Sequence, residues 1–307
     1  MKGDTKMAEN IATREAYGTA LAEFGDKYDF VVLDADLAAA TKTGIFKKKF
    51  PERFFDCGIA EGNMMTVAAG MAAAGKLVFA STFAMFAAGR AFEQVRNAIG
   101  YPQLNVKIGA THQCLEDIGA MRLIPGMTII NPADAVEARA AVEAAMTAKG
   151  PTYMRFGRLA VPVIFDKNSY KFELGKGAVL AEGKDVTIVA TGVMVDMALT
   201  ARELLANEGI SARVINIHTI KPIDREIILA AAAETGAIVT AEEHNIIGGL
   251  GSAVAEVVCE ANPVPVLRVG TEDCFGRSGK VPALLEYYGL TPQNIAAKAK
   301  AALALKK

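Results

Sequence analysis

The sequence predicts an α/β protein of two domains, each a mostly parallel sheet flanked by helices. Short apolar runs rich in Val and Ile alternate with longer helical patterns along nearly the whole chain, which is typical of strands joined by crossover helices. The alternation lapses once, between 159 and 177, and then starts again. With 307 residues, the chain is long enough for two cores. In such sheets ligands bind beyond the carboxyl ends of the strands, and we expect a site there.

The individual elements follow from apolar periodicity, with Gly or Pro closing several of them. The first series contains helices at 12–28, from 61 to a turn at 73–76, and at 87–101, 112–122 and 135–150, with strands at 29–37, 77–82, 105–108, 127–134 and 151–158. The second series contains helices at 195–209, 225–236 and 248–260, with strands at 185–192, 212–224, 237–244 and 263–270.

The domain boundaries follow from the same pattern. We assign 1–10 to a flexible tail, 11–165 to the first domain, 166–177 to a linker and 178–307 to the second domain. The tail is polar and lacks the apolar core of a secretion signal. The apolar stretch 64–89 is interrupted by Gly and Lys, which indicates a buried helix, a turn and a buried strand rather than a membrane span.

The composition excludes several classes of partner. The chain has 33 basic and 34 acidic residues and no run rich in Lys or Arg, so nothing suggests binding to nucleic acid or to an anionic membrane. Its four cysteines are far apart and form no C-x-x-C pair, which argues against a zinc or redox site and fits a cytoplasmic protein. The expected ligand is therefore a small molecule.

Most local motifs are absent or weak. There is no G-x-S-x-G for a hydrolase triad and no H-E-x-x-H for a metal. The "EEH" at 242–244 ends a strand, where acidic residues more often face solvent or an interface. The glycine-rich "GGLGSAVAEVV" from Gly248 could hold phosphate at a helix start, but it lacks the Walker lysine. A plain helix start or an interface turn is favoured.

A stronger signal lies around Glu61. This carboxylate begins an apolar helix, the next strand ends in "STFAMF" with Phe83 and Phe86, and His112 opens the helix after the "NVKI" strand. A carboxylate beside aromatic faces suits a flat heterocycle that hydrogen-bonds to the acid and stacks on a ring. The pattern alone leaves a second explanation open, in which the helix dipole stabilises Glu61 and both Phe side chains are core.

The chain resembles the C-terminal half of transketolase over nearly its whole length. Four stretches carry the resemblance: "FFDCGIAEGNMMTVAAGMAAAGK", "ASTFAMFAAGRAFEQVRN", "ATHQCLEDIGAMR" and "AEEHNIIGGLGSAVAEV". It implies a pyrimidine-binding domain followed by the C-terminal transketolase domain. Nothing in the chain resembles the family's G-D-G…N motif for diphosphate and metal. The resemblance therefore implies one subunit of a split enzyme whose N-terminal half is a separate polypeptide.

The resemblance also assigns the cofactor contacts. Glu61 matches the glutamate that hydrogen-bonds the aminopyrimidine of thiamine diphosphate and favours the tautomer that activates the thiazolium carbon. Phe86 matches the aromatic residue that stacks on the pyrimidine, and Phe83 a wall of that pocket. Asp36 matches an acidic residue at the cofactor-side interface. A further aromatic residue of many transketolases falls on Gly89, so this wall is expected to differ.

The substrate contacts follow in the same way. Arg14 and Arg158 match the arginines that grip the sugar phosphate, a role for which paired guanidinium donors are suited. His112 matches a histidine that contacts the donor's hydroxyl or the developing alkoxide. In the family a loop with another histidine and a G-E-D-G stretch precedes "ATHQ", whereas here Ile108 runs through Gly109 into Ala110. The loop is either deleted or disordered and left out.

The resemblance implies a transketolase of the pentose phosphate pathway that transfers a two-carbon ketol unit from a ketose phosphate to an aldose phosphate. It implies thiamine diphosphate shared with an N-terminal subunit, a divalent metal such as Mg held by that subunit, and a heterotetramer with two copies of each chain. Three alternatives stay open. They are the β subunit of a 2-oxo acid dehydrogenase-type decarboxylase, a deoxyxylulose phosphate synthase-like enzyme, and a non-catalytic regulatory subunit.

Overall fold

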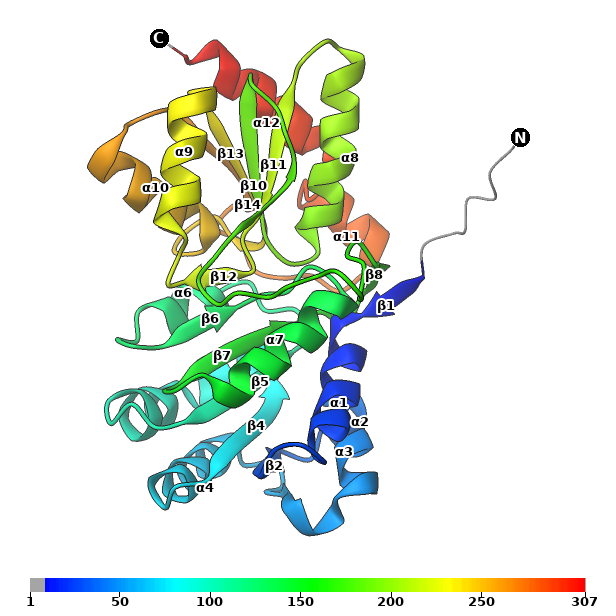
Figure 1. Cartoon of the computed structure of the whole chain (residues 1–307), viewed down its shortest axis with the longest axis vertical. Coiled ribbons are helices and arrows are strands. Elements are labelled where there is room, and N and C mark those ends of the chain that lie inside the picture. The colour runs from blue at the N-terminus through cyan, green and yellow to red at the C-terminus, as the bar shows by residue number, and fades with distance from the viewer. Residues whose placement is uncertain (1–8, 307) are drawn as a thin grey trace.

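The computed structural model describes residues 9–306, and most of the predicted tail lies outside them. Figure 1 shows two layered halves stacked along the long axis, with the C-terminal half above the N-terminal half. Strands of a seven-stranded sheet form the lower half and a five-stranded sheet forms the upper half. The predicted α/β class with parallel-dominated sheets flanked by helices is confirmed. None of the helices in the described part has both the length and the apolar character needed to cross a membrane.

The lower half is formed by the first half of the chain. Its strands are β1 (Asn10–Ala12), β2 (Phe30–Asp34), β3 (Phe54–Asp56), β4 (Leu77–Phe83), β5 (Val106–Thr111), β6 (Thr128–Ile130), β7 (Thr152–Phe156) and β8 (Ala160–Pro162). Its helices are α1 (Thr13–Phe24), α2 (Ala38–Thr41), α3 (Gly44–Lys49), α4 (Glu61–Ala73), α5 (Phe92–Gln94), α6 (Asp117–Arg122) and α7 (Ala135–Thr147), with a 3₁₀ turn η1 (Pro51–Arg53) and π-helical segments η2 (Phe86–Arg90) and η3 (Val95–Gly100).

The upper half is formed by the rest of the chain. Its strands are β9 (Ala178–Ala181), β10 (Val186–Ala190), β11 (Ala212–Asn216), β12 (Thr219–Lys221), β13 (Ile238–Asn245) and β14 (Val266–Thr271). Its helices are α8 (Met194–Asn207), α9 (Arg225–Thr235), α10 (Leu250–Ala261), α11 (Val281–Tyr287) and α12 (Pro292–Ala304).

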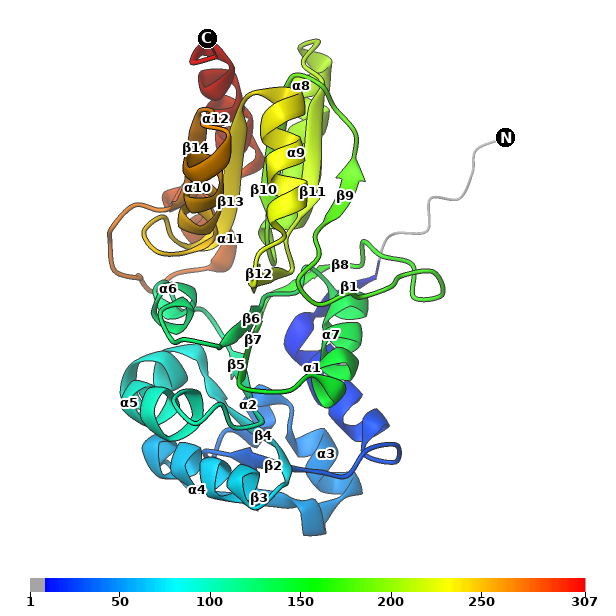
Figure 2. The ribbon, with the colours of Figure 1, turned by 60° about the vertical axis from the view of Figure 1, so that its left-hand side comes forward.

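Helices cover both faces of the lower sheet, whose order is β12-β6-β7-β5-β4-β2-β3. Figure 2 shows α4, α5 and α6 on one side and α1, α3 and α7 on the other. Large aromatic side chains such as Phe30, Phe79 and Phe156 fill the space under α1 and α7. The apolar core on the α4 side is continuous with the core under α9 and α10 of the upper half, through Ile129 and Ile215. The two halves therefore share a core.

The prediction of one continuous strand over 212–224 is wrong. The segment divides into β11, which pairs in parallel with β10 of the upper sheet, and β12, which pairs antiparallel with β6 of the lower sheet. The backbone crosses between the sheets at His218, whose carbonyl accepts a hydrogen bond from Asn131 N at 2.8 Å. Buried strands of both sheets have the same apolar pattern, so periodicity gives no sign of the crossing.

Two predicted helices also differ from the structure. The helix expected at 112–122 begins only at Asp117, because His112 has φ 68°, which no right-handed helix accommodates. The helix expected at 87–101 is a succession of π-helical and short α-helical segments. Single π turns are frequently found at functional sites.

Residues 108–110 lie within the regular strand β5. Ile108, Gly109 and Ala110 pair in register with β4 on one side and β7 on the other, with no turn between them. A Cβ at Gly109 would lie 2.2 Å from the hydroxyl of Tyr17, which is hydrogen-bonded to Ser81. Glycine is therefore required by this close packing.

A buried ion cluster joins the two halves. Arg155 is 3% exposed; its Nε donates to Asp117 at 3.1 Å and its Nη1 to Glu243 at 3.2 Å. Its Nη2 donates to the carbonyls of Cys114 and Glu243, and Tyr153 donates its hydroxyl to Asp117. Because Glu243 belongs to β13 and the other four residues to the lower half, the cluster fixes the position of one sheet relative to the other.

We predict that Arg155→Met strongly destabilises the protein, by about 3–5 kcal/mol, because it leaves two carboxylates buried without a cation. Denaturant unfolding measures the change. Arg202→Met is a matched control, since Arg202 pairs with the exposed Glu203 and such pairs contribute about 0–1 kcal/mol. Equal unfolding midpoints for the two variants would contradict the role of the cluster. Adding Asp117→Asn and Glu243→Gln to Arg155→Met should restore much of the lost stability, because the two buried carboxylates are then replaced by neutral amides.

Candidate active site

The residues singled out in the sequence lie around one edge of the lower sheet. Asp36, Phe83, His112 and Arg158 follow or end β2, β4, β5 and β7, and these strands are parallel neighbours, so their carboxyl ends meet there. Arg14 and Glu61 start α1 and α4, which lie on opposite faces of that sheet.

Glu61 is nearly inaccessible, with 1% of its surface exposed, at the first position of α4. The partial positive charge at a helix start favours a carboxylate there. Its ion-pair partner is Arg90, whose Nη1 lies 3.2 Å from Oε2 and 3.4 Å from Oε1. The same guanidinium lies over the ring of Phe86, 4.7 Å from its centre. The buried negative charge of Glu61 is thus compensated by the guanidinium of Arg90.

Arg90 is a site residue that the sequence analysis missed. Its side chain is 56% exposed, and it stands on the π-helical segment η2. A signal was available, because Arg90 is the first charged residue after Lys76 along a long apolar stretch. A lone cation there suggests a buried anion nearby.

Aromatic rings connect Glu61 with His112. Phe86 and Phe83 are stacked with ring centres 5.6 Å apart and an interplanar angle of 25°. The ring centre of the His112 imidazole lies 4.0 Å from the ring centre of Phe83. We call the row His112, Phe83, Phe86, Arg90 and Glu61 the site ladder. It offers ring faces beside a buried acid.

Gly89 lies next to the site ladder and has no free space beside it. A Cβ at this position would lie 2.4 Å from the Cε of Met85. The thiol of Cys114 donates to the Met85 sulfur at 3.7 Å. A flexible thioether therefore occupies the space of a side chain at 89.

Two arginines meet near His112. Arg14 donates from Nη1 to the carbonyl of Ala40 at 2.9 Å, and the same nitrogen lies 3.4 Å from His112 Nε2. The Nε of Arg14 is buried and has no hydrogen-bond partner among residues 9–306. Arg158 is exposed and follows Gly157, whose N–H donates to the hydroxyl of Thr13 at 2.7 Å. This bond holds the Arg158 segment against the start of α1.

Histidine 112 is held neutral. Burial, and then the charges of Arg14 and Arg158, lower the pKa of His112 to about 4. Its Nδ1 is 2.8 Å from the hydroxyl of Thr111. With Nε2 facing the Arg14 donor, the proton belongs on Nδ1, which leaves Nε2 as the acceptor. Its left-handed backbone is strained, as at many functional sites.

The structure does not connect Asp36 to the site ladder. Its backbone N–H donates to Asp56 at 3.1 Å, its φ is 61° and its side chain is exposed. Within the described residues its carboxylate makes no hydrogen bond or ion pair. Any role for Asp36 therefore requires a group from outside this chain.

The acidic and glycine-rich motifs near 242–251 are structural. Both oxygens of Glu242 accept hydrogen bonds from the backbone of Leu250 and Gly251 at the start of α10. His244 Nε2 accepts from the backbone N–H of Gly119 at 3.1 Å, across the two halves. This confirms the interpretation as a helix start and an interface. Within residues 9–306 no group of three or more His, Cys, Asp or Glu could hold a metal ion.

The arrangement fits a flat, cationic or hydrogen-bonding heterocycle beside an anionic tail. The site ladder supplies a buried carboxylate and ring faces, while Arg14 presents an unpartnered buried donor and Arg158 an exposed cation. Thiamine diphosphate has such a ring, and its aminopyrimidine would compete with Arg90 for Glu61.

Comparisons with known proteins identify the family that the chain resembles. The family models of the transketolase pyrimidine-binding domain and the transketolase C-terminal domain match residues 9–163 and 175–295. A protein of Methanocaldococcus jannaschii described as a transketolase C-terminal section is 48% identical over 298 residues, covering 92% of this chain and 93% of that protein. A 6-deoxy-6-sulfo-D-fructose transketolase subunit of a Clostridium species is 46% identical, covering 92% and 91%.

A solved structure extends the comparison to three dimensions. It is described as a split gene transketolase, an inactive β4 tetramer, and it is 56% identical in sequence with a TM-score of 0.93. The match covers 97% of this chain and 100% of that chain.

We predict that Arg14→Met raises the pKa of His112 from about 4 toward its ordinary value of 6.5, because one of the two neighbouring cations is removed. Titration of the imidazole by NMR measures this shift, with His112→Asn identifying the resonance. Arg96→Met, an exposed arginine that is not among the charges acting on His112, is the control. An unchanged His112 titration in Arg14→Met would show that the two side chains do not interact.

Proposed function

The chain belongs to the transketolase family, and from this we propose that it is the C-terminal subunit of a thiamine diphosphate-dependent transketolase. In this proposal it transfers a two-carbon ketol unit from a ketose phosphate to an aldose phosphate, and it works only with a separate N-terminal subunit. The observation that carries the proposal is Glu61, almost fully buried at the head of α4 beside stacked aromatic rings.

Glu61 has the role of orienting the cofactor and holding a proton. Its carboxylate accepts a hydrogen bond from the aminopyrimidine in place of Arg90, and the faces of Phe83 and Phe86 position the ring. Thiamine diphosphate supplies the carbon nucleophile that cleaves and forms the carbon–carbon bond. A buried acid can exchange a proton with a ring nitrogen without competition from water.

Arg14, Arg158 and His112 have the role of binding substrate. The two guanidinium groups hold the terminal oxyanion of the sugar through paired donors. The neutral imidazole of His112 offers Nε2 as an acceptor for a sugar hydroxyl. This places the anionic end of the substrate near the start of α1.

A partner completes the site in this proposal. In keeping with the resemblance to transketolase, the N-terminal subunit would hold the diphosphate and the metal, such as Mg. The exposed face of α4 includes the small or apolar residues Val67, Gly70 and Ala73 beside the polar Asn63 and Thr66, which suits close packing against another subunit. This supports self-association within a heterotetramer with two copies of each chain. Asp36, exposed near the same edge, would face the shared cofactor.

A second candidate function follows from one relative. The Clostridium subunit is named for 6-deoxy-6-sulfo-D-fructose, whose sulfonate is, like a phosphate, a terminal oxyanion. Arg14 and Arg158 suit either group. Assays with a ketose phosphate and with the sulfonate sugar separate the two donors, and an assay of 2-oxo acid decarboxylation separates both from the decarboxylase alternative.

We predict that the purified chain alone has no measurable ketol transferase activity, and that activity appears on mixing with an N-terminal subunit carrying the diphosphate and metal motif. Coupled assays of sugar phosphate transfer, with thiamine diphosphate and Mg²⁺ present, measure both. Substantial ketol transfer by the single chain would refute the split arrangement. A mixture that assembles but stays inactive with all three donor classes would favour a regulatory subunit.

We predict that Glu61→Gln lowers kcat/KM of the assembled enzyme by about 100-fold or more, since proton transfer by a positioned acid contributes roughly 10²–10⁴ in rate. Gln still accepts the Arg90 hydrogen bond, so the unfolding midpoint should change little. Glu52→Gln, an exposed acid on η1, is the control and should keep full activity. A loss of stability in Glu61→Gln with activity per folded molecule unchanged would indicate a purely structural Glu61.

A further inference from the structure

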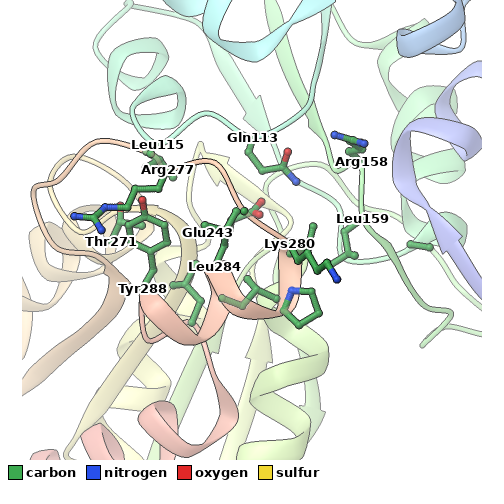
Figure 3. Close-up of a pocket in the computed structure, with 17 residues that line it drawn as sticks. Gln113, Leu115, Arg158, Leu159, Glu243, Thr271, Arg277, Lys280, Leu284 and Tyr288 are labelled. Carbon is green, nitrogen blue, oxygen red and sulfur yellow. The ribbon is translucent and has the colours of Figure 1, made fainter.

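A cavity lies between the two halves of the chain, and its lining includes Arg158 and Gln113, the residue that follows His112. Its volume is about 730 Å³, within the range of small-molecule sites. Its walls come from the segment after β5, the turn between β7 and β8, the loop from β14 into α11, and α11 with the residues that follow it, together with Glu243 of β13. Figure 3 shows residues of both halves around this space, with Gln113 and Arg158 on one side and Tyr288 and Leu284 on the other. We call it the junction pocket.

Three cations line the junction pocket. Arg158 comes from the lower half, and Arg277 and Lys280 come from the upper half. Within residues 9–306 none of the three has a carboxylate partner within 4.0 Å, whereas Lys298 nearby pairs with Glu272. Arg277 is held by stacking on Tyr287, 4.5 Å from the ring centre, which orients its guanidinium without neutralising it.

The only acidic side chain lining the pocket does not cancel this charge. Glu243 is 8% exposed, and its carboxylate is paired with Arg155 beneath the pocket. Arg155 also pairs with Asp117, so the buried cluster of one cation and two carboxylates leaves at most one negative charge uncompensated. Among the side chains that line the pocket, the three cations therefore outweigh the acidic charge.

The rest of the lining is mostly apolar. Leu115, Leu159, Val281, Leu284 and Leu285 supply most of it. A bare inorganic ion would leave this surface exposed to water, whereas an organic anion would cover it. Three cations beside an apolar lining favour a small molecule that has an oxyanion at one end and an apolar or planar part at the other.

We propose that the junction pocket is an anion-binding site for a small phosphorylated organic molecule, held jointly by Arg158 of the lower half and Arg277 and Lys280 of the upper half. Guanidinium groups bind phosphate through paired donors, and the lysine adds a point charge. The ligand bridges the two halves directly above the Arg155 cluster. Arg158 is shared with the proposed substrate site, whereas Arg277 and Lys280 are not, so variants of these two residues test the pocket separately from the proposed transferase activity.

The test uses phenyl phosphate as the probe, with the isolated full chain. Binding is measured by calorimetry and by shifts of backbone NMR signals of Gly276 and Gly279, which line the pocket. We expect saturable binding that Arg277→Gln and Lys280→Gln each weaken about tenfold, with Arg277→Lys intermediate. Arg268→Gln, an exposed arginine on β14 outside the lining, is the matched control and should bind like the wild type. Phenol should not bind.

Two results would overturn the proposal. One is the absence of saturable binding, and the other is binding that Arg14→Gln abolishes while Arg277→Gln and Lys280→Gln leave it unchanged, which would place the anion only beside His112. Because the two variants alter exposed side chains, unchanged unfolding midpoints are expected and exclude a folding defect.

The same variants identify the source of the anion in the assembled enzyme. If the pocket receives the end of a long sugar phosphate substrate, Lys280→Gln raises KM for that substrate with little change in kcat. If it receives a separate metabolite, KM for the substrate is unchanged and phenyl phosphate binding is still weakened. Both results support an oxyanion site and differ only in what fills it.

Discussion

A charge taken out of water needs a partner, and the pairing of Arg155 with Asp117 and Glu243 satisfies this requirement where the two halves of the chain meet. Hydrophobic contacts are non-directional, whereas the hydrogen bonds of an arginine with two carboxylates and two carbonyls require one geometry. The cluster thereby fixes where β13 lies relative to β7. The position of β12 in the lower sheet adds a second constraint of the same kind, through backbone hydrogen bonds.

The same requirement is met differently at Glu61. Here the partner is a single arginine on a π-helical segment, with more than half of its side chain exposed. Such a pair compensates the buried acid but is open to replacement by a ligand that donates hydrogen bonds and stacks on Phe86. The ion pairs of Arg155 are buried on both sides, whereas the partner of Glu61 is exposed, and this difference distinguishes a structural ion cluster from the proposed binding site.

The end of β7 connects the parts of the molecule. Arg155 points into the junction of the two halves, and three residues later Arg158 lies between the site near His112 and the junction pocket. A single strand therefore fixes the arrangement of the halves and presents a cation to two ligand spaces.

The sequence by itself determined the α/β class, most strands and helices, and the expectation that Glu61, Phe83 and Phe86 gather at one sheet edge, because periodicity and strand polarity are local properties of the chain. Its resemblance to transketolase supplied the expected roles. Only the tertiary structure decided that 212–224 divides between two sheets, that His112 precedes rather than begins a helix, and that Arg90 pairs with Glu61. Those outcomes depend on contacts between residues that are far apart in the chain. A local sequence pattern cannot predict the energies of such contacts.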